Sequence, residues 1–221
     1  MKKPKIFIAC DTTNLTKVKQ IIKQSKTNKI KIGYKFGLEF INSKKGRQFI
    51  SALKKKIIFI DLKLNDTVNT MVSAVKALKD LKIHYLTVHI SSGLTALKAV
   101  KKVSGFTKIV GVTTLTSLND KDLKLIGYNK SVKNLVSHQA KLATKAGLDA
   151  LVCSPYEVNA VRKFFKKEII TPGVQIGKRN FDQKRSMEAK EVKSDWLVIG
   201  RAITARGNIK KNIQNLDKEL K

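Results

Sequence analysis

Short apolar runs recur along the chain, each five to eight residues long, and polar segments separate them. The runs are residues 5–11, 30–36, 57–64, 85–90, 108–115, 150–154, 168–174 and 196–201. Runs of this length are typical of parallel strands that are buried on both faces. The pattern therefore predicts eight buried strands.

Amphipathic segments lie between the predicted strands. Apolar residues recur at helical spacing at Val68, Met71, Val72, Val75, Leu78 and Leu81, and again at Val132, Leu135, Val136, Ala140, Leu142 and Ala143. Gly147 follows the second segment, where glycine commonly ends a helix. Eight strand–helix units over residues 1–221 predict an α/β fold, a single-domain (β/α)8 TIM barrel. An open doubly wound sheet is the alternative, but no G-x-G-x-x-G motif follows the first strand.

Polar residues cluster where the predicted strands end. They are Asp11, Lys35, Asp61 with Lys63, His89, residues 113–117, Ser154, Pro172 with Gly173, and Gly200 with Arg201. Active sites of (β/α)8 barrels form at the carboxyl ends of the strands. We therefore expect these clusters to converge at one mouth of the barrel.

The stretch "DLKLND" (61–66) carries the densest charge of these clusters. Asp61 and Lys63 are two residues apart on one strand, so they share a face and point into the barrel mouth. Lys35 ends the second predicted strand on the same side. Asp66 and Thr70 share a face at the start of the next helix. The alternative interpretation of Asp61 and Lys63 is a structural ion pair inside the barrel.

Alternating lysines and aspartates satisfy the requirement that buried charges be paired. They also provide a fixed electrostatic field that water cannot supply. A lysine held between carboxylates stays protonated, so it acts as a cation and proton donor and not as a Schiff-base nucleophile.

Composition adds a strong basic excess, with 46 lysines and arginines against 16 acidic residues and a net charge of +30. The lysines are spread over the whole chain, which favours a general surface role over anion steering or nucleic-acid binding. Cys10 and Cys153 lie in apolar runs and are predicted to be reduced core residues of a cytoplasmic protein. The apolar stretch behind the N-terminus is too short for a signal peptide or a membrane span.

The remaining candidate residues favour structural roles. No spacing of histidine and acidic residues makes a metal site, and no cofactor site is evident, so neither is expected. His84 and His89 flank a strand, and His89 is expected to have a structural role. Trp196 is expected to pack between the barrel and a helix.

Seven segments in order resemble the orotidine 5′-phosphate decarboxylase family over the length of the chain. They are "FIACDTTN", "YKFGLEF", "IIFIDLKLNDTVNT", "LTVHISSG", "TTLTS", "AGLDALVCSPYE", and "TPGVQ" with "FDQKR" and "SDWLVIGRAIT". The third contains the family's Asp-x-Lys-x-x-Asp signature. The resemblance implies a barrel enzyme without cofactor or metal that converts orotidine 5′-monophosphate to UMP and CO2.

The resemblance also assigns roles by matching position. The catalytic array falls on Lys35, Asp61, Lys63 and Asp66, with Lys63 protonating C6 and Asp61 beside the departing carboxylate. Asp66, Thr67 and Thr70 reach the neighbouring subunit's site, which implies a homodimer. The substrate-binding residues are Asp11 and Lys35 at the ribose, Thr116 or Ser117 at the pyrimidine, and Pro172, Gln175, Gln183, Gly200 and Arg201 at the phosphate end. The loop from Gln175 to Gln183 closes over the phosphate.

Two positions depart from the family pattern. Gln175 stands where the family usually has arginine, and Arg179 in the same loop is a candidate substitute. Lys31 competes with Lys35 for the array position, and Lys35 is preferred because it lies at the strand end.

Two functions compete with the decarboxylase hypothesis. One is a Mg²⁺-dependent sugar-phosphate decarboxylase or synthase of the same superfamily, in which an acidic metal ligand stands where this chain has Lys35. The other is a non-enzymatic RNA-binding protein, which salt-dependent RNA retention would favour.

Overall fold

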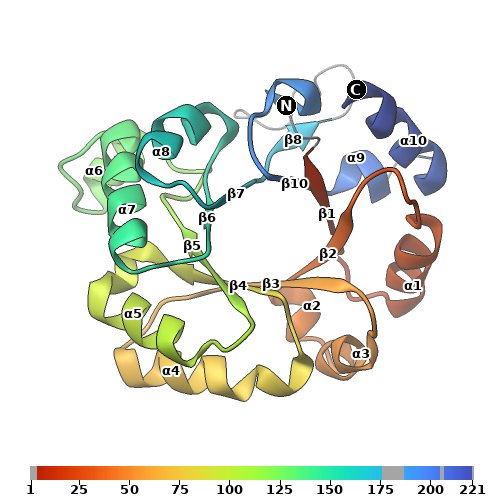
Figure 1. Ribbon diagram of the computed structural model, residues 1–221, viewed down its shortest axis with the longest axis horizontal. Coiled ribbons are helices and arrows are strands. Elements are labelled where there is room, and N and C mark those ends of the chain that lie inside the picture. The colour runs from red at the N-terminus through yellow and green to blue at the C-terminus, as the bar shows by residue number, and fades with distance from the viewer. Residues whose placement is uncertain (1–3, 176–186, 205–206, 221) are drawn as a thin grey trace.

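Eight parallel strands close into a barrel in this computed structural model, which describes residues 4–175, 187–204 and 207–220. The strands are β1 (Lys5–Ala9), β2 (Ile32–Gly37), β3 (Ile57–Leu64), β4 (Tyr85–His89), β5 (Lys108–Val112), β6 (Ala150–Val152), β7 (Glu168–Thr171) and β10 (Trp196–Ile199). Figure 1 shows the ring of strands with helices around it. The predicted (β/α)8 barrel is confirmed, and the open-sheet alternative is wrong because β1 pairs with both β2 and β10.

The predicted strands agree with the observed ones except at their ends. The third prediction, residues 57–64, matches β3 at both ends. The seventh prediction, residues 168–174, was too long, because β7 ends at Thr171 and Val174–Gln175 forms β8 of a separate two-stranded sheet with β9 (Met187–Glu188). Pro172 lacks a backbone donor and Gly173 has φ +73°, so neither continues a regular strand.

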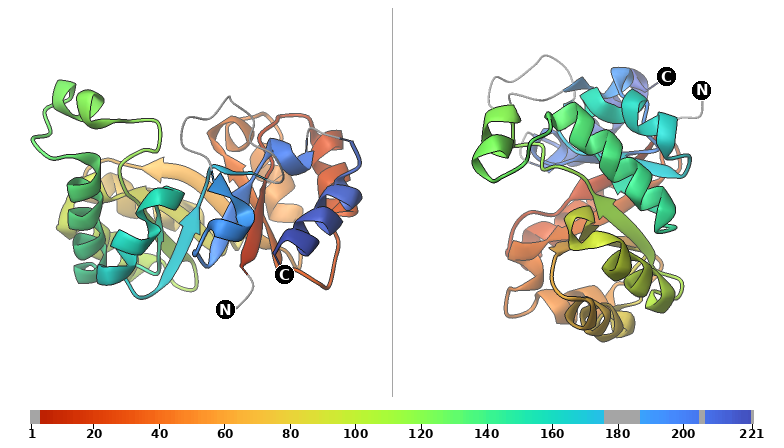
Figure 2. Two further views of the ribbon diagram at one scale, coloured as in Figure 1. Left: turned by 90° about the horizontal axis from the view of Figure 1, so that it is seen from above. Right: turned by 90° about the vertical axis from the view of Figure 1, so that its left-hand side faces the viewer.

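Helices occupy the spaces between the strands. They are α1 (Leu15–Gln24), α2 (Leu38–Ile41), α3 (Gly46–Ala52), α4 (Val68–Ala77), α5 (Gly93–Val103), α6 (Asp120–Leu125), α7 (Val132–Lys145), α8 (Val158–Phe164), α9 (Arg201–Thr204) and α10 (Ile209–Glu219), with 3-10 turns η1 (Lys79–Leu81), η2 (Ile90–Ser92), η3 (Pro155–Glu157) and η4 (Ala189–Glu191). The two views in Figure 2 show α6 standing away from the ring. None of the helices in the described part of the chain is long and apolar enough to cross a membrane.

The longest of the described helices, α7, ends where the sequence predicts. The Ser131 side chain accepts a hydrogen bond from the Asn134 N–H at its start. Gly147 follows its end with φ +74°, and the Leu148 N–H donates to the Ala143 carbonyl. Glycine adopts this left-handed conformation without steric cost, so the chain turns sharply into β6.

Apolar side chains form two layers, one between the barrel and the helices and one inside the barrel. Cys10 and Cys153 are buried and free in the outer layer, as predicted for core residues. The prediction for Trp196 was wrong, because its ring lies in the inner layer, stacked on Phe7 with centroids 3.9 Å apart. Gly33 makes room for this stack, since a Cβ at that position would lie 2.6 Å from the Phe7 ring.

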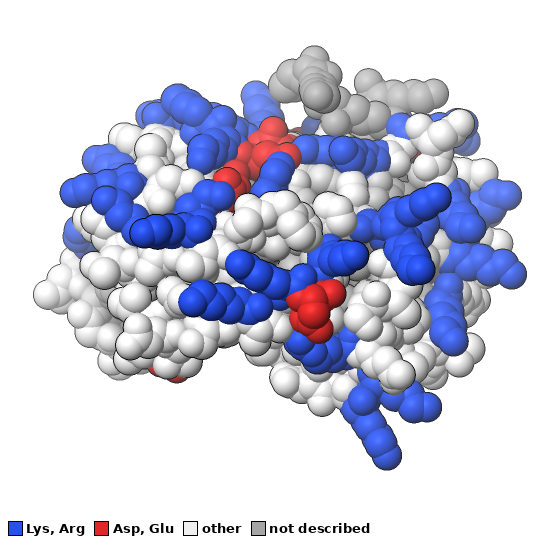
Figure 3. Space-filling view, turned by 60° about the horizontal axis from the view of Figure 1, so that its bottom comes forward, with Lys and Arg blue, Asp and Glu red and all other residues white. Residues whose placement is uncertain are grey.

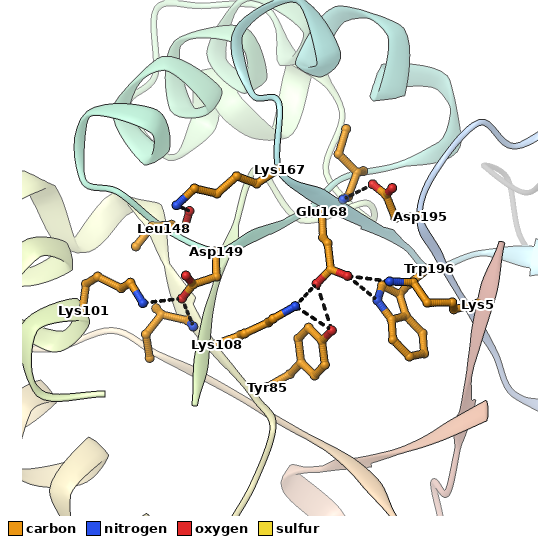
Figure 4. Close-up of polar contacts among 12 residues, drawn as sticks. Lys5, Tyr85, Lys101, Lys108, Leu148, Asp149, Lys167, Glu168, Asp195 and Trp196 are labelled. Atoms are coloured by element: carbon orange, nitrogen blue, oxygen red, sulfur yellow. Dashed lines mark hydrogen bonds and ion pairs between the residues drawn. The ribbon is translucent and has the colours of Figure 1, made fainter. Parts of the chain in front are cut away.

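Charged groups lie around Glu168 at the bottom of the barrel, the end at which the strands begin (Figure 4). Its carboxylate accepts hydrogen bonds from Lys5, from Lys108 Nζ at 2.7 Å and from the Tyr85 hydroxyl at 2.9 Å. The Trp196 ring N–H lies 3.3 Å from the same carboxylate. One carboxylate therefore links β1, β4, β5, β7 and β10.

Lysines and arginines are distributed over the surface. On the face shown in Figure 3 they cover many separate areas and surround a few acidic side chains. This face presents no single concentrated basic patch.

Candidate active site

The carboxyl ends of β1, β2 and β3 bring the charged residues together. Lys35 pairs with Ala9 of β1 and Phe59 of β3, and Gly37 pairs with Asp61. Since side chains alternate along a strand, this register directs Lys35 and Asp61 into the barrel. Lys63 lies on the same side, because its Nζ contacts Asp61. Leu62 and Leu64 face the opposite way and pack against the outer core, as the alternation predicts.

The charged side chains form a chain of ion pairs. Lys35 Nζ lies 3.1 Å from Asp11 Oδ1 and 3.4 Å from Asp61 Oδ2. Lys63 Nζ lies 3.0 Å from Asp61 Oδ1. Asp61 therefore sits between two lysines, with one carboxylate oxygen directed toward each. We call Asp11, Lys35, Asp61 and Lys63 the mouth array.

Burial and charge act in opposite directions on the two central members of the mouth array. Burial by itself would lower the pKa of Lys35, but Asp61 and Asp11 outweigh it and raise that pKa above its ordinary value. Burial would likewise raise the pKa of Asp61, but Lys35 and Lys63 outweigh it and hold that pKa below its ordinary range. Both groups are therefore charged at neutral pH.

A cavity of about 230 Å³ opens beside the mouth array. It is lined by Asp11, Lys35, Gly37, Leu38, Glu39, Phe40, Asp61 and Lys63. The side chain of Lys63 is 34% exposed, against 13% for Lys35 and 14% for Asp61. Lys63 is thus the array cation that a bound molecule can reach most directly.

The structure places one of the two competing lysines before β2 and the other within it. Lys31 precedes the strand and is exposed, whereas Lys35 lies within it and contacts two carboxylates. This geometry favours Lys35 as the array residue.

Asp66 lies outside the mouth array within one chain. Its carboxylate accepts a hydrogen bond of 2.6 Å from the Thr67 N–H, and no ion pair between Asp66 and an array lysine occurs in the described part. The Thr67 and Thr70 hydroxyls lie 3.1 Å apart at the start of α4. All three residues are exposed or partly exposed, so they face outward from this chain.

The other predicted binding residues that the structure describes follow the ends of β5, β7 and β10. Thr116 is half-buried and Ser117 exposed, in a turn closed by the Leu118 N–H donating to the Leu115 carbonyl. Pro172 precedes β8, Gln175 ends it, and Gly200 immediately precedes α9, which begins with Arg201. Gln183 and Arg179 lie outside the described residues, as does most of the predicted closing loop. Of the described members of this set, none lines the cavity beside the mouth array.

Sequence reasoning missed Thr87 and Gly37 as parts of this site. The Thr87 hydroxyl donates to Asp61 Oδ1 at 3.0 Å, and Gly37 lines the cavity. A signal for Thr87 was present, because it lies between Leu86 and Val88 in an apolar strand and two residues before His89. A hydroxyl at that position faces the barrel interior and needs a partner.

No group of three or more histidine, cysteine, aspartate or glutamate side chains in the described ranges is arranged to hold a metal ion. The cations at the mouth are lysines.

Fold and site together define a barrel enzyme with a partly buried lysine–carboxylate array at the carboxyl ends of its strands. A model of the "Orotidine 5'-phosphate decarboxylase / HUMPS family" matches residues 4–216. An orotidine 5′-phosphate decarboxylase of Wolbachia pipientis subsp. Culex pipiens is 39% identical over 212 residues, which are 92% of this chain and 92% of that protein. The chain belongs to the orotidine 5′-phosphate decarboxylase / HUMPS family.

Two further relatives agree. An orotidine 5′-phosphate decarboxylase of Buchnera aphidicola subsp. Schizaphis graminum is 38% identical over 217 residues, covering 93% of this chain and 91% of that protein. The crystal structure of orotidine 5′-phosphate decarboxylase from Lactobacillus acidophilus has a TM-score of 0.82 at 30% identity and covers 99% of both chains.

Proposed function

We propose that this chain decarboxylates orotidine 5′-monophosphate to UMP and CO2, the last step of de novo UMP synthesis. The observation that carries the proposal is the mouth array, in which Asp61 lies between Lys35 and Lys63 beside a cavity. The names of the relatives give the substrate, and the array gives a chemical reason for the reaction.

The chemistry requires a fixed positive charge. Loss of CO2 leaves a carbanion at C6 of the pyrimidine, with no adjacent carbonyl group to delocalise it. The barrier must fall by on the order of 20 kcal/mol, near the top of the usual range for enzymes. A cation held in place before the reaction stabilises this charge without reorganisation of solvent.

Lys63 is the residue that we assign to this role. Its Nζ is held by Asp61 and reaches the cavity, so it stabilises the carbanion and donates the proton that C6 receives. Asp61 lies beside the leaving carboxylate, where two negative charges repel in the ground state and separate as CO2 leaves. Lys35 keeps Asp61 charged and, with Asp11, binds the ribose hydroxyls.

The remaining roles follow the family pattern. Thr116 or Ser117 recognises the pyrimidine edge. Pro172, Gln175, Gln183, Gly200 and Arg201 bind the 5′-phosphate. Binding energy from this remote group is used to close the site and exclude water during the reaction.

The site is completed by a second copy of the chain. Asp66 and Thr70 are exposed on their own chain, so we assign them, with Thr67, to the neighbouring subunit's site in a homodimer. This arrangement adds a carboxylate to the ion-paired side chains of Lys35, Asp61 and Lys63.

The first experiment follows the loss of orotidine 5′-monophosphate absorbance with purified protein in EDTA. Wild type is expected to consume the substrate, and Lys63→Ala to lose at least roughly 1,000-fold in kcat. Lys145→Ala is the matched control, because Lys145 is exposed in the last turn of α7 and lies outside the cavity lining. Activity that requires added Mg²⁺ would indicate a sister enzyme of the superfamily, and inactivity under both conditions would overturn the proposal.

A mixing experiment tests the shared site. Lys63→Ala and Asp66→Asn are each expected to be inactive alone. Reassociation of the two at equal concentration gives heterodimers with one intact site, so about a quarter of wild-type activity should return. No recovery despite demonstrated subunit exchange would show that Asp66 serves its own chain or has no catalytic role.

A further inference from the structure

Thr87 is a fully buried hydroxyl in the middle of β4, with 0% of its surface exposed. Leu86 and Val88 on either side pack in the outer core, so Thr87 faces the barrel interior. It lies on the same face as Tyr85 below and His89 above. A buried hydroxyl in an apolar strand carries a desolvation cost unless it is fully hydrogen-bonded.

Both hydrogen-bonding functions of this hydroxyl are directed to the mouth array. Thr87 Oγ1 donates to Asp61 Oδ1 at 3.0 Å. The same oxygen accepts a hydrogen bond of 2.8 Å from the backbone N–H of Lys63. Asp61 Oδ1 is also the oxygen that Lys63 Nζ contacts, so Thr87 holds the carboxylate in the orientation that divides its two oxygens between the lysines.

The backbone at Lys63 explains why such a hydrogen bond is needed. Ile60 pairs with Leu86, but the next pairing joins Leu64 to Val88, so four residues of β3 span the length of two residues of β4. Lys63 adopts φ +51°, a left-handed conformation that is sterically unfavourable for a residue with a side chain. The interrupted strand pairing leaves the Lys63 N–H to the Thr87 hydroxyl.

We infer that Thr87 is a positioning residue of the decarboxylase site, which fixes the Asp61 carboxylate and the backbone of Lys63 in their productive arrangement. This inference rests on the proposed function and adds a residue to it. Thr87 acts through Asp61 and Lys63 and does not itself line the cavity.

The experiment compares Thr87→Val with Thr87→Ser. Valine keeps the shape of the side chain and removes the hydroxyl, whereas serine keeps the hydroxyl and removes a methyl group. Thr87→Val is expected to lose roughly 100-fold in kcat with KM changed less than about threefold. Thr87→Ser is expected to stay within about tenfold of wild type.

A pH profile separates positioning from a general loss of structure. Asp61 is faced by Lys35 on β2, Lys63 on its own strand, His89 on β4 and, through Lys35, Asp11 on β1. These groups are the same in both variants, but Thr87→Val removes one hydrogen bond to the Asp61 carboxylate. The acidic limb of kcat is therefore expected to move to higher pH in Thr87→Val only. Partial unfolding would reduce kcat without moving this limb.

A second readout does not depend on turnover. Titration of the Asp61 carboxylate by ¹³C NMR is expected to give a higher pKa in Thr87→Val than in wild type and in Thr87→Ser. If wild type is inactive but the Asp61 pKa still differs between wild type and Thr87→Val, the proposed function is rejected and the positioning role of Thr87 is kept. If wild type is active and Thr87→Val has the same kcat, pH profile and Asp61 titration as wild type, the inference is overturned. A Thr87→Ser variant that is folded and as impaired as Thr87→Val would overturn it as well.

Discussion

Replacing Glu168 by glutamine tests how the bottom of the barrel is held together. The Glu168 carboxylate accepts hydrogen bonds from Lys5, Lys108 and Tyr85 and lies next to the Trp196 ring N–H (Figure 4). Glutamine has nearly the same shape but no charge. Two lysines would then lose their counter-charge at a position whose carboxylate is only 20% exposed.

The magnitude follows from the pKa of Glu168. Burial opposes its ionisation, but hydrogen bonds from Lys108, Lys5 and Tyr85 outweigh this and lower its pKa from 4.5 to about 2. That difference corresponds to about 3 kcal/mol of stability in favour of the charged form. Because solvent at the rim screens the lysines, we expect about 2 kcal/mol, or roughly 4–8 °C in Tm for a chain of this size.

The pH dependence has a defined direction. A carboxyl group whose pKa is lower in the folded protein stabilises the fold above its unfolded pKa, and this contribution is lost as pH falls through the folded pKa. The stability difference between wild type and Glu168→Gln should therefore be full above about pH 5 and should vanish between about pH 4.5 and about pH 2.

Urea unfolding of both proteins across this pH range measures the difference. Glu188→Gln is the control, because Glu188 forms a surface ion pair with Lys190 at 3.0 Å, and such pairs contribute little to stability. Activity of Glu168→Gln should stay at the wild-type level where the protein is folded, since Glu168 begins β7 and the mouth array lies at the other ends of the strands. Equal stability of wild type and Glu168→Gln near neutral pH, or a difference that persists unchanged in acid, would refute the reasoning.

Three other predictions concern separate parts of the molecule. Gly37→Ala places a Cβ 3.6 Å from Lys35 Nζ, inside the cavity, so steady-state kinetics should show KM raised roughly tenfold at unchanged Tm. An unchanged KM would contradict this prediction. Burial raises the pKa of Cys10 to about 12 and that of Cys153 beyond it, so a thiol reagent should modify neither at about pH 8 until denaturant is added, and fast labelling of the native protein would disprove this. Gly147→Ala forces a side chain into φ +74°, so urea unfolding should show a loss of about 1 kcal/mol with kcat unchanged, and a neutral result would argue against the strain.

The mouth array is the basis on which we propose a reaction that needs no metal ion. Lys35 occupies a position that contacts both Asp11 and Asp61. A lysine there pairs with the carboxylates that would otherwise be ligands for a divalent cation. This charge arrangement favours metal-independent decarboxylation, and the EDTA experiment tests it.

The sequence by itself determined the strands, the fold class and the location of the charged cluster. Periodicity is a local property, and a buried parallel strand appears in the sequence as a continuous apolar run. Such a run can be recognised without knowing which strands lie beside it. The same period of two directed Asp61 and Lys63 to one face and Leu62 to the other. Motif order along the chain then pointed to the family.

Only the tertiary structure decided which residues meet. The register between β1, β2 and β3 brings Asp61 next to Lys35, whereas Lys31 lies before β2 begins. The break in pairing between β3 and β4 gives Thr87 its partners. These contacts join residues from different strands, and nothing in the local pattern of one strand specifies its alignment with the next.

Packing inside the barrel was likewise beyond the sequence. Trp196 was expected to face a helix, but it stacks on Phe7, and Gly33 on the neighbouring strand β2 leaves space for the Phe7 ring. The volume available to a side chain depends on residues that closure of the barrel brings together from distant parts of the chain. Local periodicity therefore fixes which way a strand's side chains alternate, whereas closure and register fix what each side chain contacts.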